Sequence, residues 1–459
     1  MGHFIGRKRE LEYLDELYSR PGRHTCAIYG RRRIGKSALI KKFCEDKPSI
    51  YIQFVDGSES VNLDIIRAAV TSYRGTDPGA YDNMFRALVS LSEICKEKKT
   101  ILVFDEFPYL SSSADYIPSA VQRFIDMDLQ DADVMLIICG SSIRLMTDET
   151  EDPKRPLYGR FPLRIKLGPL SPAECREFHP NMSDIDAFRV YLAVGGVPYY
   201  HEMMNGKTFE ECVIKNFLSS PSPLLDEASV MIARELPAVS TCTAIVHFLA
   251  RGSTRIKEIS EKTRITEQAC GKYLKDMGLV DMVERVNPMV GAPKHPLFRI
   301  KDCLIRFYFM VLEGRPNLLP NEDAAAVYKK IEHDIDMCMG MTFEDVCSDY
   351  ICRTMMCKDI GKWWGRAGDE DRDVDIVAIV SENGYDVSLL CECKFRRKPI
   401  GFGVLNQLKD TAEYIRHLSN RRFVIFSAYG FDDDLSEYVE EYGKDSDIRL
   451  IDLDDIYSG

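Results

Sequence analysis

The stretch CAIYGRRRIGKSALIKKF, residues 26–43, decides the fold of the amino-terminal part of the chain. It has the pattern of a short apolar strand, a loop and a helix. Gly30, Gly35, Lys36 and Ser37 stand at the spacing of the GxxxxGK[ST] loop. Such a loop wraps backbone N–H groups around phosphates at a helix N-terminus. We therefore predict an α/β sheet with a phosphate-binding loop at the end of this strand.

The loop residues have different expected roles in binding a nucleoside triphosphate. Lys36 supplies a positive charge for the β- and γ-phosphates, and Ser37 offers its hydroxyl to Mg²⁺. The residues expected to line the nucleotide are Gly30, Arg31, Arg32, Arg33, Ile34, Gly35, Lys36, Ser37 and Ala38.

A second stretch, TILVFDEFPYL at residues 100–110, predicts a buried strand that ends in two acids. Parallel sheets present their ligands at the carboxyl ends of the strands, where the phosphate loop also lies. We expect Asp105 to hold Mg²⁺ through water and Glu106 to polarise the attacking water.

Three further apolar stretches lie at residues 49–54, 133–142 and 162–170. With the two strands above they predict five strands separated by helices, a doubly wound parallel sheet. Ser141 and Ser142 follow the second of these stretches. This pair either senses the γ-phosphate, with Ser141 near the nucleotide, or caps the next helix.

The order of these motifs resembles the AAA+ superfamily, specifically the archaeal-type ATPases that also occur in bacteria. The matching stretches are FIGRKREL (4–11), the phosphate loop, VFDEFPYL (103–110), ICGSSIRLM (138–146), LYGRFPLRIKLGPL (157–170) and GGVPYY (195–200). The resemblance implies ATP as the nucleotide, with residues 4–11 near the adenine.

Two features of this resemblance keep alternatives open. Arg160 would reach phosphate, in cis or from a neighbouring copy, or it is an ordinary arginine at a strand edge. Residues 193–200 would belong to a small helical lid, or they mark a helix that stops at glycine. The resemblance also suggests a homo-oligomeric ring, although monomers and dimers occur in this subclass.

The middle of the chain predicts a winged helix-turn-helix. Three short helical stretches, at residues 243–252, 254–263 and 265–278, precede two strands around a Pro/Gly loop. Residues 240–306 hold twelve Lys+Arg against seven Asp+Glu, although the whole chain has a net charge of −12. The exposed candidates for DNA contact are Gln268, Lys272, Lys275, Arg285 and Lys294. The alternative is a module for protein contact.

The last third predicts a hairpin that carries charge. Residues 374–380 and 385–395 read as two strands around Asn383-Gly384, a strong hairpin signal. Antiparallel pairing would bring Asp375 beside Glu392 and Lys394. Two carboxylates form a hard oxygen site that suits Mg²⁺ or Mn²⁺. A lysine beside them fits metal-assisted phosphodiester hydrolysis.

This arrangement resembles the PD-(D/E)xK nuclease superfamily, with Val374 where the proline would stand. The resemblance implies that Glu344 on the preceding helix adds a metal-side carboxylate and that Gln407 is a neighbour of the site. The alternatives are a simple salt bridge of Lys394 with one acid, or a nuclease fold that has lost activity.

These patterns divide the chain into four parts: an ATPase core (1–170), a helical lid (171–236), a winged helix (237–312) and a nuclease-like α/β domain (313–459). Apolar runs are too short to span a bilayer, and the start of the chain does not have the pattern of a signal peptide. We therefore expect a cytoplasmic protein with reduced cysteines and no membrane contact.

The function expected from the sequence is ATP hydrolysis coupled to action on DNA, with a metal-dependent nuclease domain. The rival is a nucleotide-switched regulator that binds DNA or protein through an inactive nuclease-like domain.

Overall fold

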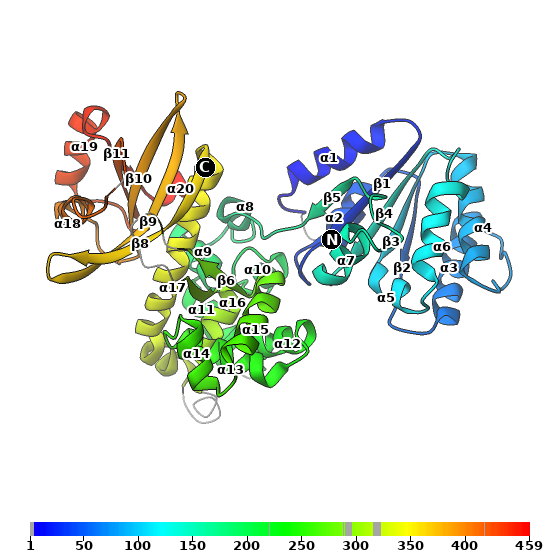
Figure 1. Ribbon diagram of the computed structural model, residues 1–459, viewed down its shortest axis with the longest axis horizontal. Coiled ribbons are helices and arrows are strands. Elements are labelled where there is room, and N and C mark those ends of the chain that lie inside the picture. Colours follow the sequence, from blue (N-terminus) through cyan, green and yellow to red (C-terminus); the bar gives the residue numbers. More distant parts are fainter. Residues whose placement is uncertain (1–3, 220, 288, 290–295, 315–322, 417) are drawn as a thin grey trace. The chain divides into compact units, whose positions relative to one another are not determined.

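The computed structural model describes residues 4–219, 221–287, 289, 296–314, 323–416 and 418–459. The chain forms two compact units. The first holds the residues up to Leu170 together with Val197–Tyr199, and the second holds Ser171–Gly196 and Tyr200–Gly459. Each unit contains a five-stranded sheet (Figure 1).

The sheet of the first unit is the predicted one. Its five strands are all parallel and follow the order β2-β3-β4-β1-β5. Their bounds are β1 Arg23–Tyr29, β2 Ser49–Gln53, β3 Thr100–Asp105, β4 Val134–Gly140 and β5 Leu163–Lys166. In register, Tyr29 faces Gly140 and Gln53 faces Asp105, so the strands end at one edge.

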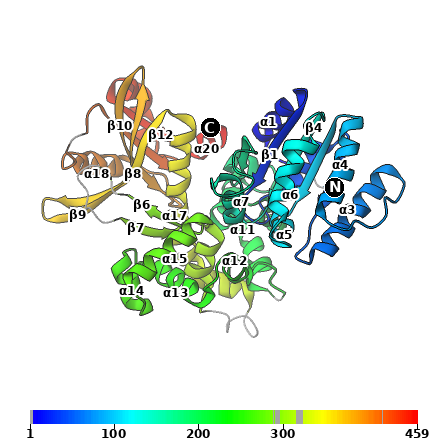
Figure 2. The same cartoon turned by 45° about the vertical axis from the view of Figure 1, so that its right-hand side comes forward.

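Helices cover this sheet on both faces. They are α1 Lys8–Ser19, α2 Lys36–Cys44, α3 Glu59–Arg74, α4 Met84–Glu97, α5 Phe107–Ser112, α6 Ile117–Arg123, the π-helical segment η1 Phe124–Asp128 and α7 Ile143–Glu151. Ala27 and Tyr29 of β1 share one buried cluster with α3, α4 and α6, which gather beside the strands in Figure 2. Because side chains alternate along a strand, Cys26 and Ile28 are buried on the other face.

The second unit begins with short helices: α8 Pro172–Arg176, α9 Asp184–Val194, α10 Pro198–Met203, α11 Phe209–Val213, the π-helical η2 Ile214–Leu218 and α12 Glu227–Glu235. We predicted a helical lid over residues 171–236, and within the second unit these helices pack with later parts of the chain. The ring of Phe188 meets Phe343 at 5.9 Å, and Phe217 meets Phe307 at 5.3 Å. Burial of these rings joins the helices to one core.

The winged-helix pattern appears as three helices and a hairpin. The elements are α13 Val239–Ala250, α14 Ile256–Thr263, α15 Glu267–Leu279, β6 Val283–Val286 and β7 Leu297–Ile300, followed by α16 Cys303–Phe307 and the π-helical η3 Tyr308–Leu312. β6 and β7 are antiparallel, with Val286 opposite Leu297. One hydrophobic cluster joins the three helices and both strands. Lys294 lies outside the described residues.

The second sheet has the order β12-β11-β10-β9-β8. Its elements are α17 Ala324–Thr354, β8 Cys357–Ala367, β9 Glu370–Glu382, β10 Tyr385–Lys394, α18 Phe402–Ala412, β11 Arg421–Ser427, α19 Asp433–Ser446, β12 Ile448–Ile451 and α20 Leu453–Ser458. β8, β9 and β10 are antiparallel, and β10, β11 and β12 are parallel.

The predicted hairpin is β9 and β10. Asn383 and Gly384 both have positive φ, 49° and 85°, as a two-residue turn with a right-handed strand twist requires. β8 was not predicted, and it pairs with β9 at the edge of the sheet. The sequence around it, CKDIGKWWGRA, has no regular alternation of apolar and polar residues. Its pairing with β9 therefore depends on the tertiary structure.

Candidate active sites

The phosphate loop closes over the start of α2. Gly35 stands before this helix with φ 95°, and a Cβ on Gly30 would lie 2.5 Å from the carbonyl oxygen of Leu167. Glycine is therefore required at both positions. Lys36 is buried, and its Nζ donates to the carbonyls of Gly30 at 2.8 Å and Arg31 at 2.9 Å. A buried ammonium surrounded by loop carbonyls fits an anionic ligand at this loop.

The segment before α1 lies beside this loop. Arg7 is buried at φ 62° and donates to the carbonyl oxygens of Ile34 at 3.2 Å and Gly168 at 2.6 Å. These bonds bring residues 4–11 to the phosphate loop, in keeping with the expected place near the nucleotide. The guanidinium of Arg33 lies 4.2 Å from the ring centre of Tyr199. Gly195 ends α9 with φ 68°, so the glycine stop expected in this stretch is present.

Asp105 ends β3 next to the loop and is 2% exposed. Its Oδ2 accepts from the hydroxyls of Ser37, at 3.0 Å, and of Tyr51, and its Oδ1 accepts from the N–H of Glu106 at 3.0 Å. Burial and the neighbouring Asp105 raise the pKa of Tyr51 well above its usual value. A hydroxyl and a carboxylate in contact form a hard oxygen pair that fits Mg²⁺.

Tyr51 is a residue that the sequence patterns missed. It lies on β2, directly beside β3, where Tyr51 faces Val103 in register. A tyrosine two residues before the carboxyl end of a predicted parallel strand was the available signal.

Glu106 and Ser141 meet at the same edge. Glu106 has φ 53°, and its Oε2 accepts from the Oγ of Ser141 at 3.1 Å and from the Ser141 N–H at 3.4 Å. The next residue, Ser142, accepts from the N–H of Leu145 and caps α7. The two serines therefore differ in place: one contacts the predicted catalytic carboxylate and the other caps the helix.

Arg160 lies away from the phosphate loop of its own unit. Its carbonyl accepts from Thr25 near the start of β1, and its Nη2 lies 2.8 Å from Asp126 Oδ2. From Thr25 to Tyr29 a strand extends about 13 Å. The structure thus does not bring Arg160 to its own nucleotide loop, because β5 begins at the opposite edge of the parallel sheet. A role toward a neighbouring copy stays a prediction.

The hairpin of the second sheet brings three predicted residues together. Lys394 Nζ contacts Glu392 Oε1 and lies 3.9 Å from Asp375 Oδ2. The N–H of Cys393 donates to Asp375 Oδ2 at 2.8 Å. Glu392 and Lys394 thus share one face of β10, as the spacing predicted. Cys391 and Cys393 are buried free thiols, in keeping with packing.

Glu344 of α17 reaches the same cluster with an unpredicted partner. Its Oε2 contacts Nζ of Lys362, which lies on β8. Burial raises the pKa of Glu344, Lys362 opposes that shift, and the charge of Asp375 adds to it. The sequence patterns missed Lys362 because they did not predict β8. We call Glu344, Lys362, Asp375, Glu392 and Lys394 the carboxylate–lysine cluster.

Burial shapes the charges of this cluster. It raises the pKa of Glu392 to about 7, with a further contribution from Asp375 and an opposing one from Lys394. The carboxylate oxygens are the donor type that Mg²⁺ or Mn²⁺ prefers. Among the described residues, however, no three His, Cys, Asp or Glu side chains are arranged to hold a metal. The donor set therefore fits a divalent cation in kind, and two lysines offset part of its negative charge.

Other predicted contacts lie elsewhere in the second unit. Gln268, Lys272 and Lys275 are exposed on α15, and Arg285 is exposed on β6. Gln407 is exposed on α18, and its side chain has no hydrogen bond to the cluster within the described part of the chain.

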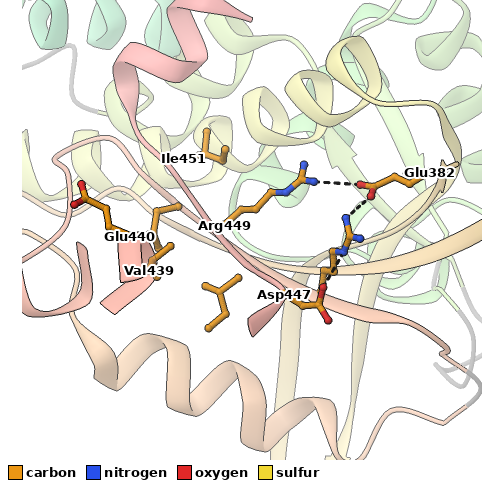
Figure 3. A pocket seen from close by; sticks show the side chains of 9 residues that line it. Glu382, Val439, Glu440, Asp447, Arg449 and Ile451 are labelled. Atoms are coloured by element: carbon orange, nitrogen blue, oxygen red, sulfur yellow. Dashed lines mark hydrogen bonds and ion pairs between the residues drawn. The ribbon is translucent and has the colours of Figure 1, made fainter. Parts of the chain in front are cut away.

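A pocket beside β12 is a separate feature (Figure 3). Arg449 faces Glu382, and Arg422 contacts both Glu382 and Asp447. Glu382 stands seven residues beyond Asp375 on β9, which places it about 23 Å away along an extended strand. The pocket therefore does not belong to the carboxylate–lysine cluster.

Comparison with known proteins supports the reading of the first unit. Residues 4–204 match the family model of an ATPase domain predominantly from Archaea. Residues 308–408 match a family of archaeal and bacterial proteins of unknown function. An uncharacterized protein of Methanocaldococcus jannaschii is 29% identical over 388 residues, which cover 82% of this chain and 84% of that protein.

Two further proteins resemble parts of the chain. An uncharacterized ATP-binding protein of M. jannaschii is 48% identical over 44 residues, 10% of this chain and 75% of its own length. The structure of a Walker-type ATPase from Pyrococcus abyssi aligns with a TM-score of 0.51 and 17% identity, over 67% of this chain and 96% of its own. This likeness shows a shared fold.

The first unit is therefore a P-loop ATPase domain with a parallel α/β sheet. The match of residues 4–204 to an ATPase domain found predominantly in Archaea supports ATP binding and hydrolysis by this unit, with the Mg²⁺ usual for such domains. A separate mixed sheet follows in the second unit. Among the described residues, no helix is both long enough and apolar enough to cross a membrane.

Proposed function

We propose that this protein uses ATP to control a metal-dependent phosphodiesterase that acts on DNA. The observation that carries the proposal is the meeting of Asp375, Glu392 and Lys394 at the end of the β9–β10 hairpin, with Glu344 arriving from α17. The order helix, antiparallel hairpin, helix and further strands supports the resemblance to PD-(D/E)xK nucleases.

Each residue has a proposed role. Asp375, Glu392 and Glu344 would hold the cation, which when bound would activate water and offset charge on the phosphate. Lys394 would orient the water or stabilise the charge that develops on phosphate oxygens. On α15, Lys272 and Lys275 are exposed and would contact the DNA backbone.

In the ATPase domain, Ser37 and Asp105 would hold Mg²⁺, and Lys36 would contact the terminal phosphates. Glu106 would polarise the attacking water, with Ser141 orienting it. Because Arg160 lies at the opposite edge of its own sheet, we propose that it acts toward the nucleotide of a neighbouring copy in a homo-oligomer.

The division of the chain stays part of the proposal. Residues 1–170 would be the ATPase core, 171–236 its lid, 237–312 the winged helix and 313–459 the nuclease-like domain. The packing of α9 against α17 and of η2 against α16 supports a lid that moves together with these later helices.

The test combines ATPase and cleavage assays on the full chain. Purified protein with ATP and Mg²⁺ or Mn²⁺ is offered linear, nicked and branched DNA, single strands and RNA. We expect cleavage that is lost in Asp375→Asn and Lys394→Met, and ATP turnover that is lost in Lys36→Ala. Lys358→Met is a matched control, because this exposed lysine pairs with Asp386 outside the cluster.

A second candidate is a nucleotide-switched regulator with an inactive nuclease-like domain. The pairing of both glutamates with lysines favours it, since no metal arrangement is present among the described side chains. Nucleotide-dependent DNA binding that Lys36→Ala abolishes, without cleavage of any substrate under either metal, would select this candidate.

A further inference from the structure

β8 brings a second lysine into the carboxylate–lysine cluster. Nζ of Lys362 contacts Oε2 of Glu344, and the two side chains are 26% and 20% exposed. Lysine is rarely so enclosed unless it has a partner, because its ammonium loses hydration on burial. The enclosed pair therefore differs from an ordinary surface ion pair.

A β-bulge aims Lys362 at the cluster. Gly361 faces Val377 and Trp363 faces Val374, so the single residue Lys362 stands opposite both Asp375 and Ile376. Such bulges redirect side chains and occur often beside active sites. Here the extra residue of β9 is at Asp375 itself, the carboxylate shared by both halves of the cluster.

The backbone of Lys362 is held from two sides. Its carbonyl oxygen accepts from the N–H of Met289 at 2.9 Å. The next residue, Trp363, is buried in one hydrophobic cluster with Met289 and with Leu408 of α18. These contacts hold the backbone of β8 in place at Lys362. The side chain of Lys362 therefore starts from a fixed position beside Glu344.

The balance of charges in the cluster sets Lys362 against a divalent cation. Three carboxylates, Glu344, Asp375 and Glu392, share two ammonium groups, Lys362 and Lys394. A divalent cation that binds the carboxylates must therefore displace an ammonium or bind against its repulsion.

We propose that Lys362 is a positioning residue of the phosphodiesterase site, which orients Glu344 and competes with the divalent cation for its carboxylate. This inference rests on the proposed function. It predicts effects of opposite sign on removal of the ammonium: the cation binds more tightly because the repulsion is gone, while cleavage slows because Glu344 is no longer oriented.

The first experiment measures Mn²⁺ binding to the full chain by calorimetry. Lys362→Met should lower the Mn²⁺ Kd about tenfold, since one positive charge is removed beside the cation. Lys362→Arg should keep a Kd within about threefold of the original protein, because it keeps the charge. Lys358→Met, on the same strand, should leave the Kd unchanged. A Lys362→Met Kd equal to that of Lys358→Met overturns the proposal.

The second experiment removes both partners, which also covers the case in which Lys362→Met does not fold. Glu344→Gln combined with Lys362→Met leaves the net charge of the cluster as it was, so the Mn²⁺ Kd should return to within about threefold of the original value. If the double variant binds as tightly as Lys362→Met, Glu344 is not the contested carboxylate and the proposal fails.

Cleavage of DNA under saturating Mn²⁺ tests the second predicted effect, the slower cleavage. Lys362→Met should lower kcat about tenfold or more with little change in KM, and Lys362→Arg should restore part of it. If the original protein binds Mn²⁺ and cuts DNA while Lys362→Met behaves like Lys358→Met, only this inference falls. If the original protein neither binds Mn²⁺ nor cuts, the proposed function falls with it.

Discussion

In the first unit, Asp105 and Glu106 are held by hydroxyl and amide donors, whereas in the second unit Glu344 and Glu392 each contact a lysine. Neutral donors orient a carboxylate and leave its negative charge in place. An ammonium orients it and cancels the charge. The carboxylates of the first site therefore keep their negative charge, whereas those of the second site are offset by lysines.

The difference bears on how each site acquires a cation. Beside the phosphate loop, the charge of Asp105 stays available for Mg²⁺ that arrives with the nucleotide. In the carboxylate–lysine cluster, the proposed cation would have to compete with Lys362 and Lys394. Outside the two sites, the second unit also contains a buried arginine paired with a carboxylate, and a pair of buried histidines. The four predictions below probe this contrast, from the largest expected effect to the smallest.

The largest effect is expected at Glu106. Glu106→Gln keeps the shape of the side chain and its contact with Ser141 but removes the base, so ATP turnover should fall about a thousandfold while ATP binding persists. Steady-state hydrolysis and nucleotide binding measure the two quantities. Turnover within about threefold of the original protein would show that the hydroxyl-held acid is not the base.

The next effect tests how much a buried ion pair matters in the second unit. Arg306 is 1% exposed and joins α16 to α17 through Asp345, at 2.7 Å, and Thr342, at 2.9 Å. Arg306→Met should lower the free energy of unfolding by about 3–4 kcal/mol, because it leaves Asp345 without this partner. Denaturant unfolding measures the loss.

Arg251→Met is the matched control for that change. Arg251 is an exposed arginine of α13 that pairs with Glu313 at 2.8 Å. Exposed pairs contribute little, so a loss below about 1 kcal/mol is expected. Equal losses in the two variants would contradict the distinction between buried and exposed pairs in this unit.

The histidine pair of the second unit should make stability depend on pH. His179 and His201 are buried with their ring nitrogens 2.8 Å apart, and the other nitrogen of His201 lies 2.8 Å from the Gly195 carbonyl. Burial lowers the pKa of His179 to about 4, and burial with the neighbouring ring lowers that of His201 to about 3.

Both folded pKa values lie below the usual 6.5, so the unfolded chain binds more protons between these limits. The free energy of unfolding should therefore fall as the pH drops from about 6.5 toward about 4, by about 2–3 kcal/mol between pH 7 and pH 5.5. His201→Gln should flatten this dependence, whereas His24→Gln, at a half-buried histidine outside this pair, should not. Identical pH profiles for the two variants would contradict the prediction.

The smallest effect is expected at Tyr51. Tyr51→Phe removes one hydroxyl donor to Asp105 but no charge, so ATP turnover should fall about fivefold, equivalent to about 1 kcal/mol. The Mg²⁺ concentration needed for half-maximal turnover should rise with it. Tyr29→Phe is the control, because that hydroxyl donates to Glu151 at 3.2 Å. Unchanged Mg²⁺ dependence would show that Ser37 alone orients Asp105.

Much of the first site was predictable because its residues follow strands within short motifs. Lys36 and Ser37 follow β1 after the loop of residues 30–35, and Asp105 ends β3, so local pattern and the rule for parallel sheets place them together. The position of Arg160 could not be predicted by this rule. Its motif lies before β5, so Arg160 is at the end of the sheet opposite the phosphate loop. The LYGR motif alone does not show at which end of the sheet it lies.

In the second unit, the Asn383-Gly384 turn predicted the hairpin and hence the meeting of Asp375 with Glu392 and Lys394. Lys362 was not predictable in the same way. Its strand has no clear alternation, and its position depends on a β-bulge and on a backbone bond from Met289, which is distant in sequence.

The sequence by itself determined the phosphate loop, the acidic strand end and the charged hairpin, because short-range spacing and turn chemistry set them. Only the tertiary structure decided which partner holds each acid: hydroxyls at Asp105 and Glu106, lysines at Glu344 and Glu392. It also placed the helices after residue 170 in one compact unit with α13, α14, α15 and the β6–β7 hairpin. The physical reason is that a side chain's partners depend on strand pairing and packing between segments far apart in the chain, which no local pattern specifies.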